Sequence, residues 1–263
     1  MITLGVDIGS LTGKALVLCD GEIVSWEIVP TGPDSVETAR LVTGRALEKA
    51  GRSLEEMSYV VSTGYGRVVV PFAQKNISEI SCHAKGATWL YPEVRSILDM
   101  GGQDCKAIRC ESSGKVTNFV MNDKCAAGAG RSMGIVAELL ELPLEQVGPL
   151  SLEAAKSVPI SSTCVVFARS EVLGHLRDGV SRAEILAGAC DALVKRVSGL
   201  LKKVGVEPDF VITGGIAKNP GVVRRIEERF GVEAKICFEP QIVGALGAAL
   251  FARDLAAKRA NAR

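Results

Sequence analysis

The sequence predicts a duplicated α/β fold with two lobes, and three observations indicate it. Apolar, β-branched runs separated by short turns open the chain, and helical patterns follow them. The same order returns in the second half, again with an acidic-glycine turn after the first strand. No low-complexity linker separates the two halves. We therefore expect residues 1–93 and 240–263 to form one lobe and residues 94–239 the other, with a cleft between them.

In the first half, three strands are expected at residues 2–9, 14–20 and 22–31, joined by the turns "GSLTG" and "DG". Closely spaced strands with such turns predict an antiparallel meander. A helix follows at residues 35–51, with Ser35 as its expected N-cap and Gly51 just past its end. The strand 59–64 and the helix 79–90 complete this half.

The second half repeats the pattern of three strands followed by helices. Its elements are expected at residues 94–102, 105–111 and 115–123 for the strands, and at 128–142, 164–179 and 181–205 for the helices. A strand at 210–215, a helix at 219–231, a short strand at 234–239 and a final helix from Pro240 follow. Strands interleaved with helices in this way predict sheets covered by helices.

Length, composition and charge narrow the possible functions. The chain has 263 residues, 47% of them hydrophobic and 23% charged, which is typical of a globular protein with a sizeable core. Lys and Arg total 31 against 30 for Asp and Glu, so no basic surplus supports binding to nucleic acid or to an anionic membrane.

Two features predict a cytoplasmic chain without a membrane anchor. The opening "MITLGVDIGS" has neither the basic segment nor the cleavable apolar run of a signal peptide. The apolar segment "IVGALGAALFA" is shorter than the roughly 20 residues that cross a bilayer.

Three glycine-rich turns could hold a nucleotide. "DIGSLTGK" (residues 7–14) and "DMGGQDCK" (residues 99–106) occupy equivalent places in the two halves. Glycines let backbone amides approach a phosphate, and the leading Asp can hold Mg²⁺ directly or through water. Lys14 and Lys106 add positive charge. Either turn alone could equally be a plain hairpin. The pairing of the two turns, and a third element, "VITGGIAKNPG" (residues 211–221), favour a nucleotide site.

Among eight cysteines, Cys125 and Cys164 stand at or just before expected helix starts. Free amides and the helix dipole favour a thiolate there, and a thiolate is the better metal ligand. Two cysteines do not complete a four-cysteine iron–sulfur site, although a two-fold dimer would supply four. From the residues alone, structural thiols and cluster ligands both remain open.

Other polar motifs are weaker candidates. Cys105 and Cys110 lie within one expected strand without a second pair to complete a zinc site, so a structural role is expected. His83 and His175 lack the spacing of a metal motif. "STGYGR" (residues 62–67) has the pattern of a strand-to-helix turn.

The chain resembles a known family in "GVDIGSLTGK", "STGYGR", "DMGGQDCK", "NDKCAAGAGR", "STCVVFARSEV" and "VITGGIAKNPG". These motifs are similar to those of the activators (component A) of 2-hydroxyacyl-CoA dehydratases and of the ATPase subunits of benzoyl-CoA reductases. The resemblance implies an actin/hexokinase/Hsp70-like (ribonuclease H-like) fold. It also implies an oxygen-sensitive, ATP-hydrolysing homodimer that delivers single low-potential electrons in anaerobic metabolism.

The resemblance also implies cofactors and partners. ATP or ADP with Mg²⁺, and one [4Fe–4S] cluster per dimer held by Cys125 and Cys164 of both chains, are the expected cofactors. Ferredoxin or flavodoxin is the expected donor. The expected acceptor is a 2-hydroxyacyl-CoA dehydratase, a benzoyl-CoA reductase or a double-cubane-cluster-type protein. The resemblance further implies that "STGYGR" is a loop at an interface or beside the nucleotide.

Site residues follow from the matching motifs. Mg²⁺ is assigned to Asp7 and Asp99, directly or through water, and orientation of the attacking water to Gln103 or Asp104. The expected nucleotide contacts are Ser10, Leu11, Thr12, Lys14, Gly101, Gly102, Gln103, Gly128, Ala129, Gly130, Gly214, Gly215 and Ile216.

Two rival functions stay open at this point. A small-molecule kinase of the same fold, acting on an amino sugar or a carboxylate, would need an acidic base near an acceptor hydroxyl, a role that Asp104 could fill. A nucleotide-gated scaffold with slow ATPase activity would need no cluster at all. The acceptor and its acyl-CoA or other substrate are not readable from the sequence.

Overall fold

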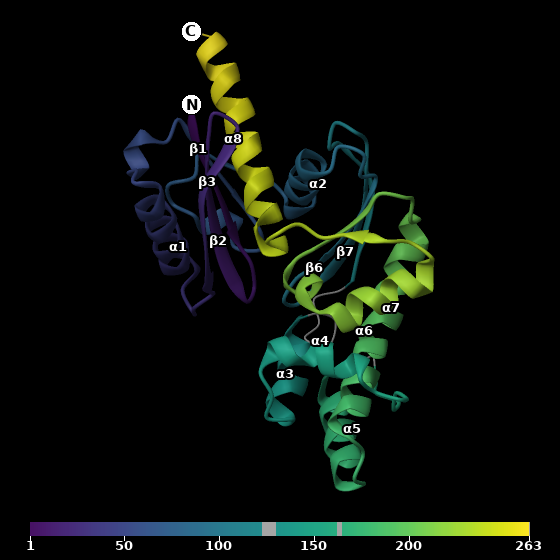
Figure 1. Cartoon of the computed structure of the whole chain (residues 1–263). Coiled ribbons are helices and arrows are strands. Elements are labelled where there is room, and N and C mark those ends of the chain that lie inside the picture. The colour runs from purple at the N-terminus through teal and green to yellow at the C-terminus, as the bar shows by residue number, and fades with distance from the viewer. Residues whose placement is uncertain (123–129, 162–164, 263) are drawn as a thin grey trace. The chain divides into compact units, whose positions relative to one another are not determined.

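The computed structural model describes residues 1–122, 130–161 and 165–262 of the chain (Figure 1). These residues form two compact units. Unit 1 comprises Met1–Arg95, Cys110–Thr117 and Cys237–Arg263, and unit 2 comprises Ser96–Arg109 and Asn118–Ile236. Each unit contains one five-stranded sheet within the described residues. The fold class expected from the sequence, a duplicated α/β architecture, is confirmed at the level of two mixed sheets covered by helices.

The sheet of unit 1 has the order β3-β2-β1-β4-β5. Its strands are β1 (Ile2–Ile8), β2 (Thr12–Cys19), β3 (Glu22–Pro30), β4 (Tyr59–Thr63) and β5 (Lys75–Asn76). The first three strands pair antiparallel, as the turn signals predicted, and β4 pairs parallel to β1. A parallel partner needs a crossover, and α1 (Ser35–Ala50), with the short η1 (Leu54–Glu56), supplies it.

Alternation along β1 decides which side chains face which helix. Leu4, Val6 and Ile8 join the core that α1 covers. The intervening residues face α8 (Val243–Asn261): the Thr3 hydroxyl donates to the Ala249 carbonyl at 3.1 Å. Because side chains alternate with a period of two, Asp7 also points to the α8 side, at the end of the strand.

α8 packs closely enough on its neighbours that some positions exclude any side chain. A Cβ on Gly5 of β1 would lie 1.9 Å from the Ala245 carbonyl oxygen, and one on Gly247 would lie 1.8 Å from that of Cys82. Cys82 belongs to α2 (Glu79–Leu90). Glycine at these contacts lets α8 lie directly against the sheet and α2. The helix follows η5 (Pro240–Ile242), in agreement with the final helix expected from Pro240.

The N-cap predicted for α1 is wrong by one residue. Asp34, and not Ser35, caps the helix, because its Oδ1 accepts from the backbone N–H groups of Val36 and Glu37 at 2.7 and 3.3 Å. Asp and Ser are comparable N-caps, so the two neighbouring residues could not be separated by type alone. Gly51 ends the helix in the left-handed conformation, as expected.

The sheet of unit 2 has the order β10-β9-β6-β7-β8. Its strands are β6 (Ser96–Met100), β7 (Cys105–Cys110), β8 (Val116–Met121), β9 (Phe210–Thr213) and β10 (Ala234–Lys235). β6 pairs antiparallel to β7 and parallel to β9. This is the same arrangement as around β1, so the duplication inferred from the sequence extends to strand pairing.

The helices of unit 2 are α3 (Gly130–Leu139), α4 (Leu144–Leu152), α5 (Val165–Arg177), α6 (Arg182–Val204) and α7 (Pro220–Phe230), with the short η4 (Gly215–Lys218) before α7. The core of the unit joins β6 and β9 to α6 and α7 through fully buried side chains such as Leu98, Phe210 and Ile226. α4 was not expected from the sequence. It contains Pro149, and the helical pattern around it is short.

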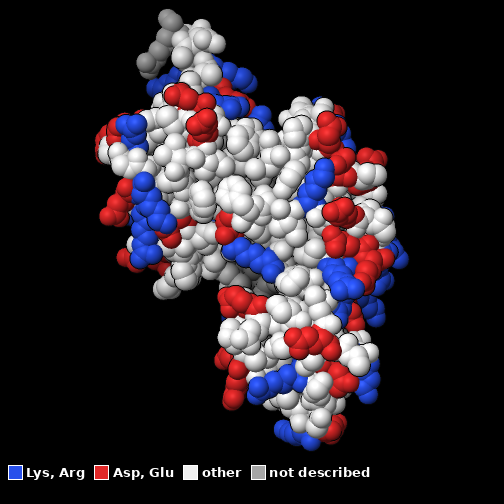
Figure 2. Space-filling view, in the orientation of Figure 1, with Lys and Arg blue, Asp and Glu red and all other residues white. Residues whose placement is uncertain are grey.

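Two surface features complete the description. Lysines and arginines are interspersed with aspartates and glutamates on the face drawn in Figure 2, as the near-equal totals of both charges lead one to expect. Within residues 1–122, 130–161 and 165–262, none of the helices combines the length and the apolar composition that a membrane span requires.

Candidate functional site

In unit 1, the carboxylate of Asp7 and the ammonium group of Lys14 face each other across the β1–β2 hairpin. The two residues are direct partners in the strand register, and Lys14 Nζ lies 3.2 Å from Asp7 Oδ2. The same Nζ donates to the Thr12 carbonyl at 3.2 Å. Only 5% of the Asp7 surface is exposed. The predicted metal ligand is therefore a buried, charge-paired carboxylate at the mouth of a hairpin.

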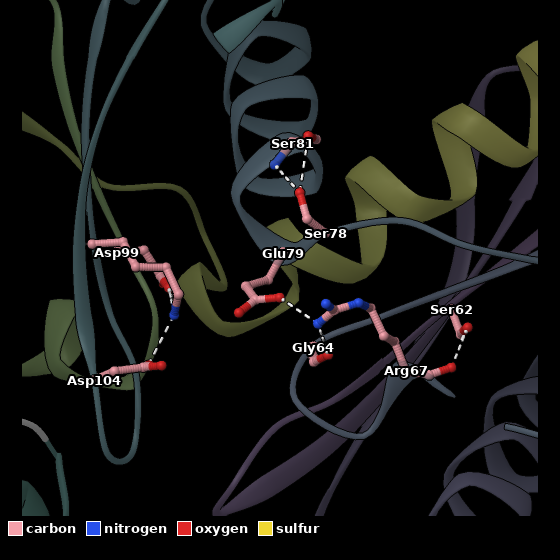
Figure 3. Close-up of polar contacts among 9 residues, drawn as sticks. Ser62, Gly64, Arg67, Ser78, Glu79, Ser81, Asp99 and Asp104 are labelled. Carbon is pink, nitrogen blue, oxygen red and sulfur yellow. Dashed lines mark hydrogen bonds and ion pairs between the residues drawn. The ribbon is translucent and has the colours of Figure 1, made fainter. Parts of the chain in front are cut away.

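The turn after β4 presses against the same carboxylate. Gly64 has a φ of +83°, and a Cβ there would lie 2.2 Å from Asp7 Oδ1. Figure 3 shows what holds this turn: Arg67 donates to the Gly64 carbonyl at 3.0 Å and pairs with Glu79 at 3.1 Å. The Ser62 hydroxyl donates to the Arg67 carbonyl at 2.8 Å. "STGYGR" thus packs on Asp7, the residue predicted to hold Mg²⁺.

His83 lies beside Asp7, where sequence reasoning assigned only an ordinary helix residue. A Cβ on Gly244, at the start of α8, would lie 2.9 Å from His83 Nε2 and 3.1 Å from Asp7 Oδ2. His83 is buried. The sequence gives no signal of this proximity, because it depends on α8 and α2 meeting at the end of β1.

Unit 2 repeats this arrangement with Asp99 and Lys106; Figure 3 labels Asp99 and the neighbouring Asp104. They too are direct partners across a hairpin, with Lys106 Nζ 3.5 Å from Asp99 Oδ2 and 2.8 Å from Asp104 Oδ1. The Thr213 hydroxyl donates to Asp99 Oδ1 at 3.1 Å. Gly214 has a φ of +84°, and a Cβ there would lie 2.9 Å from Asp99 Oδ1.

The Asp7–Lys14 and Asp99–Lys106 hairpins have the same arrangement. In each, an Asp at a strand end pairs with a Lys on the antiparallel strand, and the parallel strand ends in Thr-Gly with the glycine at positive φ. Paired hairpins with buried carboxylates, close backbone and nearby lysines suit the phosphates and Mg²⁺ of a nucleotide. At Gly9, a Cβ would lie 3.0 Å from both Lys14 Nζ and the Thr12 carbonyl oxygen, so the turn leaves its backbone bare.

The other predicted nucleotide contacts lie where the motifs placed them along the chain. Ser10 and Leu11 lie in the first hairpin turn and Thr12 begins β2, whereas Gly101, Gly102 and Gln103 lie in the second turn, all at least partly exposed. Gly215 is exposed and Ile216 is buried in η4, directly after β9. Gly128 and Ala129 lie outside the described residues.

The start of α3 is bonded to the second hairpin turn. The N–H of Gly130 donates to the Gly101 carbonyl at 2.9 Å, and the N–H of Arg131 donates to the Gly102 carbonyl at 2.9 Å. First-turn amides of a helix have no acceptor within the helix. Here the carbonyl groups of residues 101 and 102 act as acceptors for two of these amides, so the start of α3 is hydrogen-bonded to the turn.

The family of the chain is shown by comparison with known proteins. Residues 4–252 match the model of the BadF/BadG/BcrA/BcrD ATPase family. The chain belongs to this family. It is 47% identical to the activator of lactoyl-CoA dehydratase from Anaerotignum propionicum, over 98% of this chain and 100% of that protein.

Solved structures agree with the family assignment. The activator of the 2-hydroxyisocaproyl-CoA dehydratase from Clostridium difficile, with bound ADPNP, matches with a TM-score of 0.95 and 41% identity, covering 100% of this chain and 98% of that one. A ROK family glucokinase from Streptomyces griseus matches with a TM-score of 0.61 at 14% identity, covering 97% of this chain and 100% of that one. The second likeness shows the shared actin/hexokinase-like fold alone.

In this BadF/BadG/BcrA/BcrD ATPase, four described cysteines are buried thiols with raised pKa values. Burial raises the pKa of Cys82 to about 12 and raises the pKa of Cys105, Cys110 and Cys190. Buried thiols with raised pKa values are typical of structural cysteines. Within the described part of the ATPase, no three His, Cys, Asp or Glu side chains are grouped as a metal site.

Cys125 and Cys164, the predicted cluster ligands, lie outside the described residues. The segment that leads to Cys164 is nevertheless anchored on α5. The N–H of Ser161 donates to Glu171 Oε2 at 2.5 Å, and His175 Nε2 lies 3.0 Å from the Pro159 carbonyl oxygen. Glu171 and His175 are four residues apart, on one face of the helix. The sequence did not predict these two contacts, because the residues that they join are 10 and 16 positions apart.

Proposed function

We propose that this ATPase is an activator that delivers single low-potential electrons to a partner oxidoreductase, driven by ATP hydrolysis. The partner classes are a 2-hydroxyacyl-CoA dehydratase, a benzoyl-CoA reductase or a double-cubane-cluster-type protein. The names of its relatives support the dehydratase class first, because the 47% and 41% identical proteins are both dehydratase activators. We propose a cytoplasmic homodimer that works in anaerobic metabolism.

The observation that carries the proposal is the hydrogen bonding of α3 to the second hairpin turn. Gly130 and Arg131 donate to carbonyls of the predicted phosphate-binding turn, and Cys125 precedes them by only a few residues. We infer that a nucleotide-dependent shift of that turn would be passed to the start of α3 through these two hydrogen bonds. We propose that an ATP-driven electron carrier uses this link between its phosphate turn and the chain that follows Cys125, a link for which a small-molecule kinase has no evident use.

Within the nucleotide site, we assign Mg²⁺ to Asp7 and Asp99, directly or through water, because carboxylate oxygen is its preferred ligand. Lys14 and Lys106 neutralise these carboxylates and lie at the turns that receive the phosphates. Asp104 Oδ1 accepts from Lys106 at 2.8 Å, so this oxygen is occupied by an ion pair. Gln103 and Asp104, both on this turn and both partly exposed, are our two candidates for orienting the attacking water.

We assign the cluster to Cys125 and Cys164 of both protomers. When bound, a [4Fe–4S] cluster supplies the one-electron chemistry that the protein chain lacks. The four buried thiols with raised pKa values are in keeping with structural roles for Cys82, Cys105, Cys110 and Cys190. Ferredoxin or flavodoxin is the proposed donor.

In this proposal, nucleotide binding supplies the free energy that shifts the dimer between two conformations. A ligand shifts a conformational equilibrium only through its different affinities for the two states. Moving a dimer from 1:99 to 99:1 takes about 5.5 kcal/mol of such difference. We propose that contacts of phosphate and Mg²⁺ with these Asp–Lys hairpins, each within its own unit, differ between the ATP and ADP states.

Iron and sulfide analysis of anaerobically purified protein tests the proposal. We expect about four irons for two chains. Cys125→Ser and Cys164→Ser should each abolish the brown colour and leave a folded chain, whereas Cys19→Ser, at the end of β2, should keep it. A colourless wild-type protein, or colour that persists in both variants, would reject the cluster assignment. Phosphorylation of an added sugar or carboxylate by a colourless protein would instead support the kinase alternative.

A further inference from the structure

The side chain of Arg67 joins the turn after β4 to the start of α2. Arg67 Nη1 donates to the Gly64 carbonyl at 3.0 Å and to Glu79 Oε2, on the first residue of α2, at 3.1 Å (Figure 3). The Arg67 N–H donates to the same Gly64 carbonyl at 3.3 Å. The Arg67 carbonyl accepts from the buried Ser62 hydroxyl at 2.8 Å. The main chain and the side chain of Arg67 are therefore both fixed.

Gly64 passes this restraint to the Asp7 carboxylate. Its φ is +83°, and a Cβ there would lie 2.2 Å from Asp7 Oδ1 and 2.6 Å from the Ile8 carbonyl oxygen. The Gly66 N–H donates to that Ile8 carbonyl at 2.8 Å, so the turn is also bonded to the end of β1. Because packed groups at such distances transmit displacement, a shift of the Gly64 backbone would change the space open to the Asp7 carboxylate.

The equivalent turn of unit 2 has an alanine in the place of Arg67. Arg67 stands three positions after Gly64, and Ala217 stands three positions after Gly214. The Ala217 N–H donates to the Gly214 carbonyl at 3.2 Å, so the backbone hydrogen bond of this turn is the same in both units. The guanidinium group is what distinguishes the turn of unit 1.

The two carboxylates also differ in the groups that orient them. In unit 2, the Thr213 hydroxyl donates to Asp99 Oδ1 at 3.1 Å. Thr63 has the same place beside Asp7 in the strand register, but its buried hydroxyl is not hydrogen-bonded to Asp7 in the part of the chain that the structure describes. The backbone of Gly64 lies close to Asp7 Oδ1 instead.

We propose that Arg67 is a positioning residue that acts through Gly64 on Asp7. The inference rests on the proposed function, in which Asp7 holds Mg²⁺, and needs neither the cluster nor the electron acceptor. Glu79 fixes the guanidinium group, which fixes the Gly64 carbonyl. The Gly64 backbone then limits the orientations open to the Asp7 carboxylate. Arg67 need not touch Mg²⁺ or the nucleotide for this role.

Positioning and simple electrostatics predict opposite signs when Arg67 is removed. Loss of a nearby positive charge should strengthen the binding of a cation at Asp7, because like charges repel. Loss of positioning should weaken it. Arg67→Ala and Glu79→Gln should therefore change Mg²⁺ binding in the same direction if Glu79 acts through Arg67. They should change it in opposite directions if charge alone matters.

Nucleotide binding by the anaerobically purified protein tests this role without catalysis. The dissociation constant of a fluorescent, non-hydrolysable ATP analogue is measured in EDTA and in excess Mg²⁺, and the ratio of the two constants reports what Mg²⁺ adds. We expect this ratio to fall about fivefold in Arg67→Ala, which corresponds to about 1 kcal/mol for one hydrogen bond. Glu79→Gln should also lower the ratio. Arg67→Lys keeps a cationic donor and should restore most of it, whereas general damage to the fold would weaken both affinities and leave the ratio unchanged.

Arg52 supplies the matched control. Its Nη1 lies 3.1 Å from Glu56 Oε1, the same distance as in the Arg67–Glu79 pair, but both side chains are exposed. Arg52→Ala should keep the wild-type ratio. Asp7→Asn should show the largest loss, because it replaces the carboxylate itself.

The outcomes separate this inference from the proposed function. An unchanged or increased ratio in Arg67→Ala, while Mg²⁺ tightens binding in the wild type, would overturn the inference alone. A wild type in which Mg²⁺ adds nothing would reject both the assignment of Asp7 to Mg²⁺ and the inference. A lowered ratio in a protein that binds no iron would support the inference and reject the proposed cluster.

Discussion

At the residue scale, the site depends on glycines that leave room for buried carboxylates. Gly64 and Gly214 both have positive φ, and each would place a Cβ within 3 Å of a carboxylate oxygen, of Asp7 and Asp99 respectively. Positive φ is accessible to glycine at little cost. The two Thr-Gly turns therefore fix the orientation of the two proposed Mg²⁺ ligands.

Gly64→Ala tests this at the first carboxylate. The added methyl must displace Asp7, so we expect ATPase activity to fall at least about tenfold. Gly51→Ala is the matched control, because Gly51 also has positive φ, at +62°, with open space around its Cβ position. It should cost roughly 1 kcal/mol of unfolding free energy and keep the activity. Steady-state assays measure the ATPase activity of both variants, and urea denaturation measures their free energy of unfolding. Equal activities of the two variants would contradict the role of Gly64.

Cys82 makes stability depend on alkaline pH. Burial, with the nearby charge of Asp7, raises the pKa of this thiol from 9.0 to about 12. Above about pH 9 the unfolded chain loses the proton first. The stabilising contribution is therefore complete below that pH and is lost as pH rises toward 12, by up to about 1.4 kcal/mol per pH unit.

Cys82→Ala should make this decline shallower. Urea denaturation of cluster-free protein between pH 7.5 and 10.5 measures the free energy of unfolding of both proteins. The slope against pH is compared and not the absolute stability, because removing a buried side chain also leaves a cavity. Parallel curves for the wild type and the variant would show that Cys82 contributes nothing to the alkaline loss.

At the element scale, most strands and helices could be predicted because periodicity and turn residues are local. The hairpins of both halves and the helix ends marked by glycine agree with the structure. The cap of α1 was misplaced because Asp34 and Ser35 are both good caps. α4 was missed because Pro149 interrupts its pattern. These errors come from residues whose local preferences do not separate the alternatives.

α5 supplies a prediction at this scale. Glu171 accepts from the Ser161 N–H and so holds the segment that leads to Cys164. Glu171→Ala leaves this amide without its carboxylate acceptor, at a cost of about 1–3 kcal/mol. If the proposed cluster is bound at Cys125 and Cys164, we expect an iron chelator to remove iron from the anaerobically purified protein several-fold faster in this variant. Glu171→Gln keeps an oxygen acceptor and should resemble the wild type, whereas identical rates in all three proteins would argue against the anchor.

At the scale of the whole molecule, duplication indicated the two Asp–Lys hairpins, and long-range packing limited what else could be predicted. Asp7 and Asp99 were predicted as Mg²⁺ ligands because the same motif occurs twice. His83 could not, since its proximity to Asp7 arises only when α8 meets α2. Asn122 belongs to the motif "NDKCAAGAGR", but its hydrogen bond with Cys105 joins residues 17 positions apart, so the spacing of the motif does not predict it.

The central claim is that ATP turnover and electron delivery are one coupled process. A single-turnover experiment tests it most directly. Anaerobic, dithionite-reduced protein is mixed with a 2-hydroxyacyl-CoA dehydratase, with ATP, with ADP or without nucleotide, and oxidation of the cluster is followed by its visible absorbance and by electron paramagnetic resonance. We predict rapid oxidation only when ATP and the acceptor are both present. Oxidation at the same rate without ATP, or ATP hydrolysis that leaves the cluster reduced in the presence of its acceptor, would contradict the account.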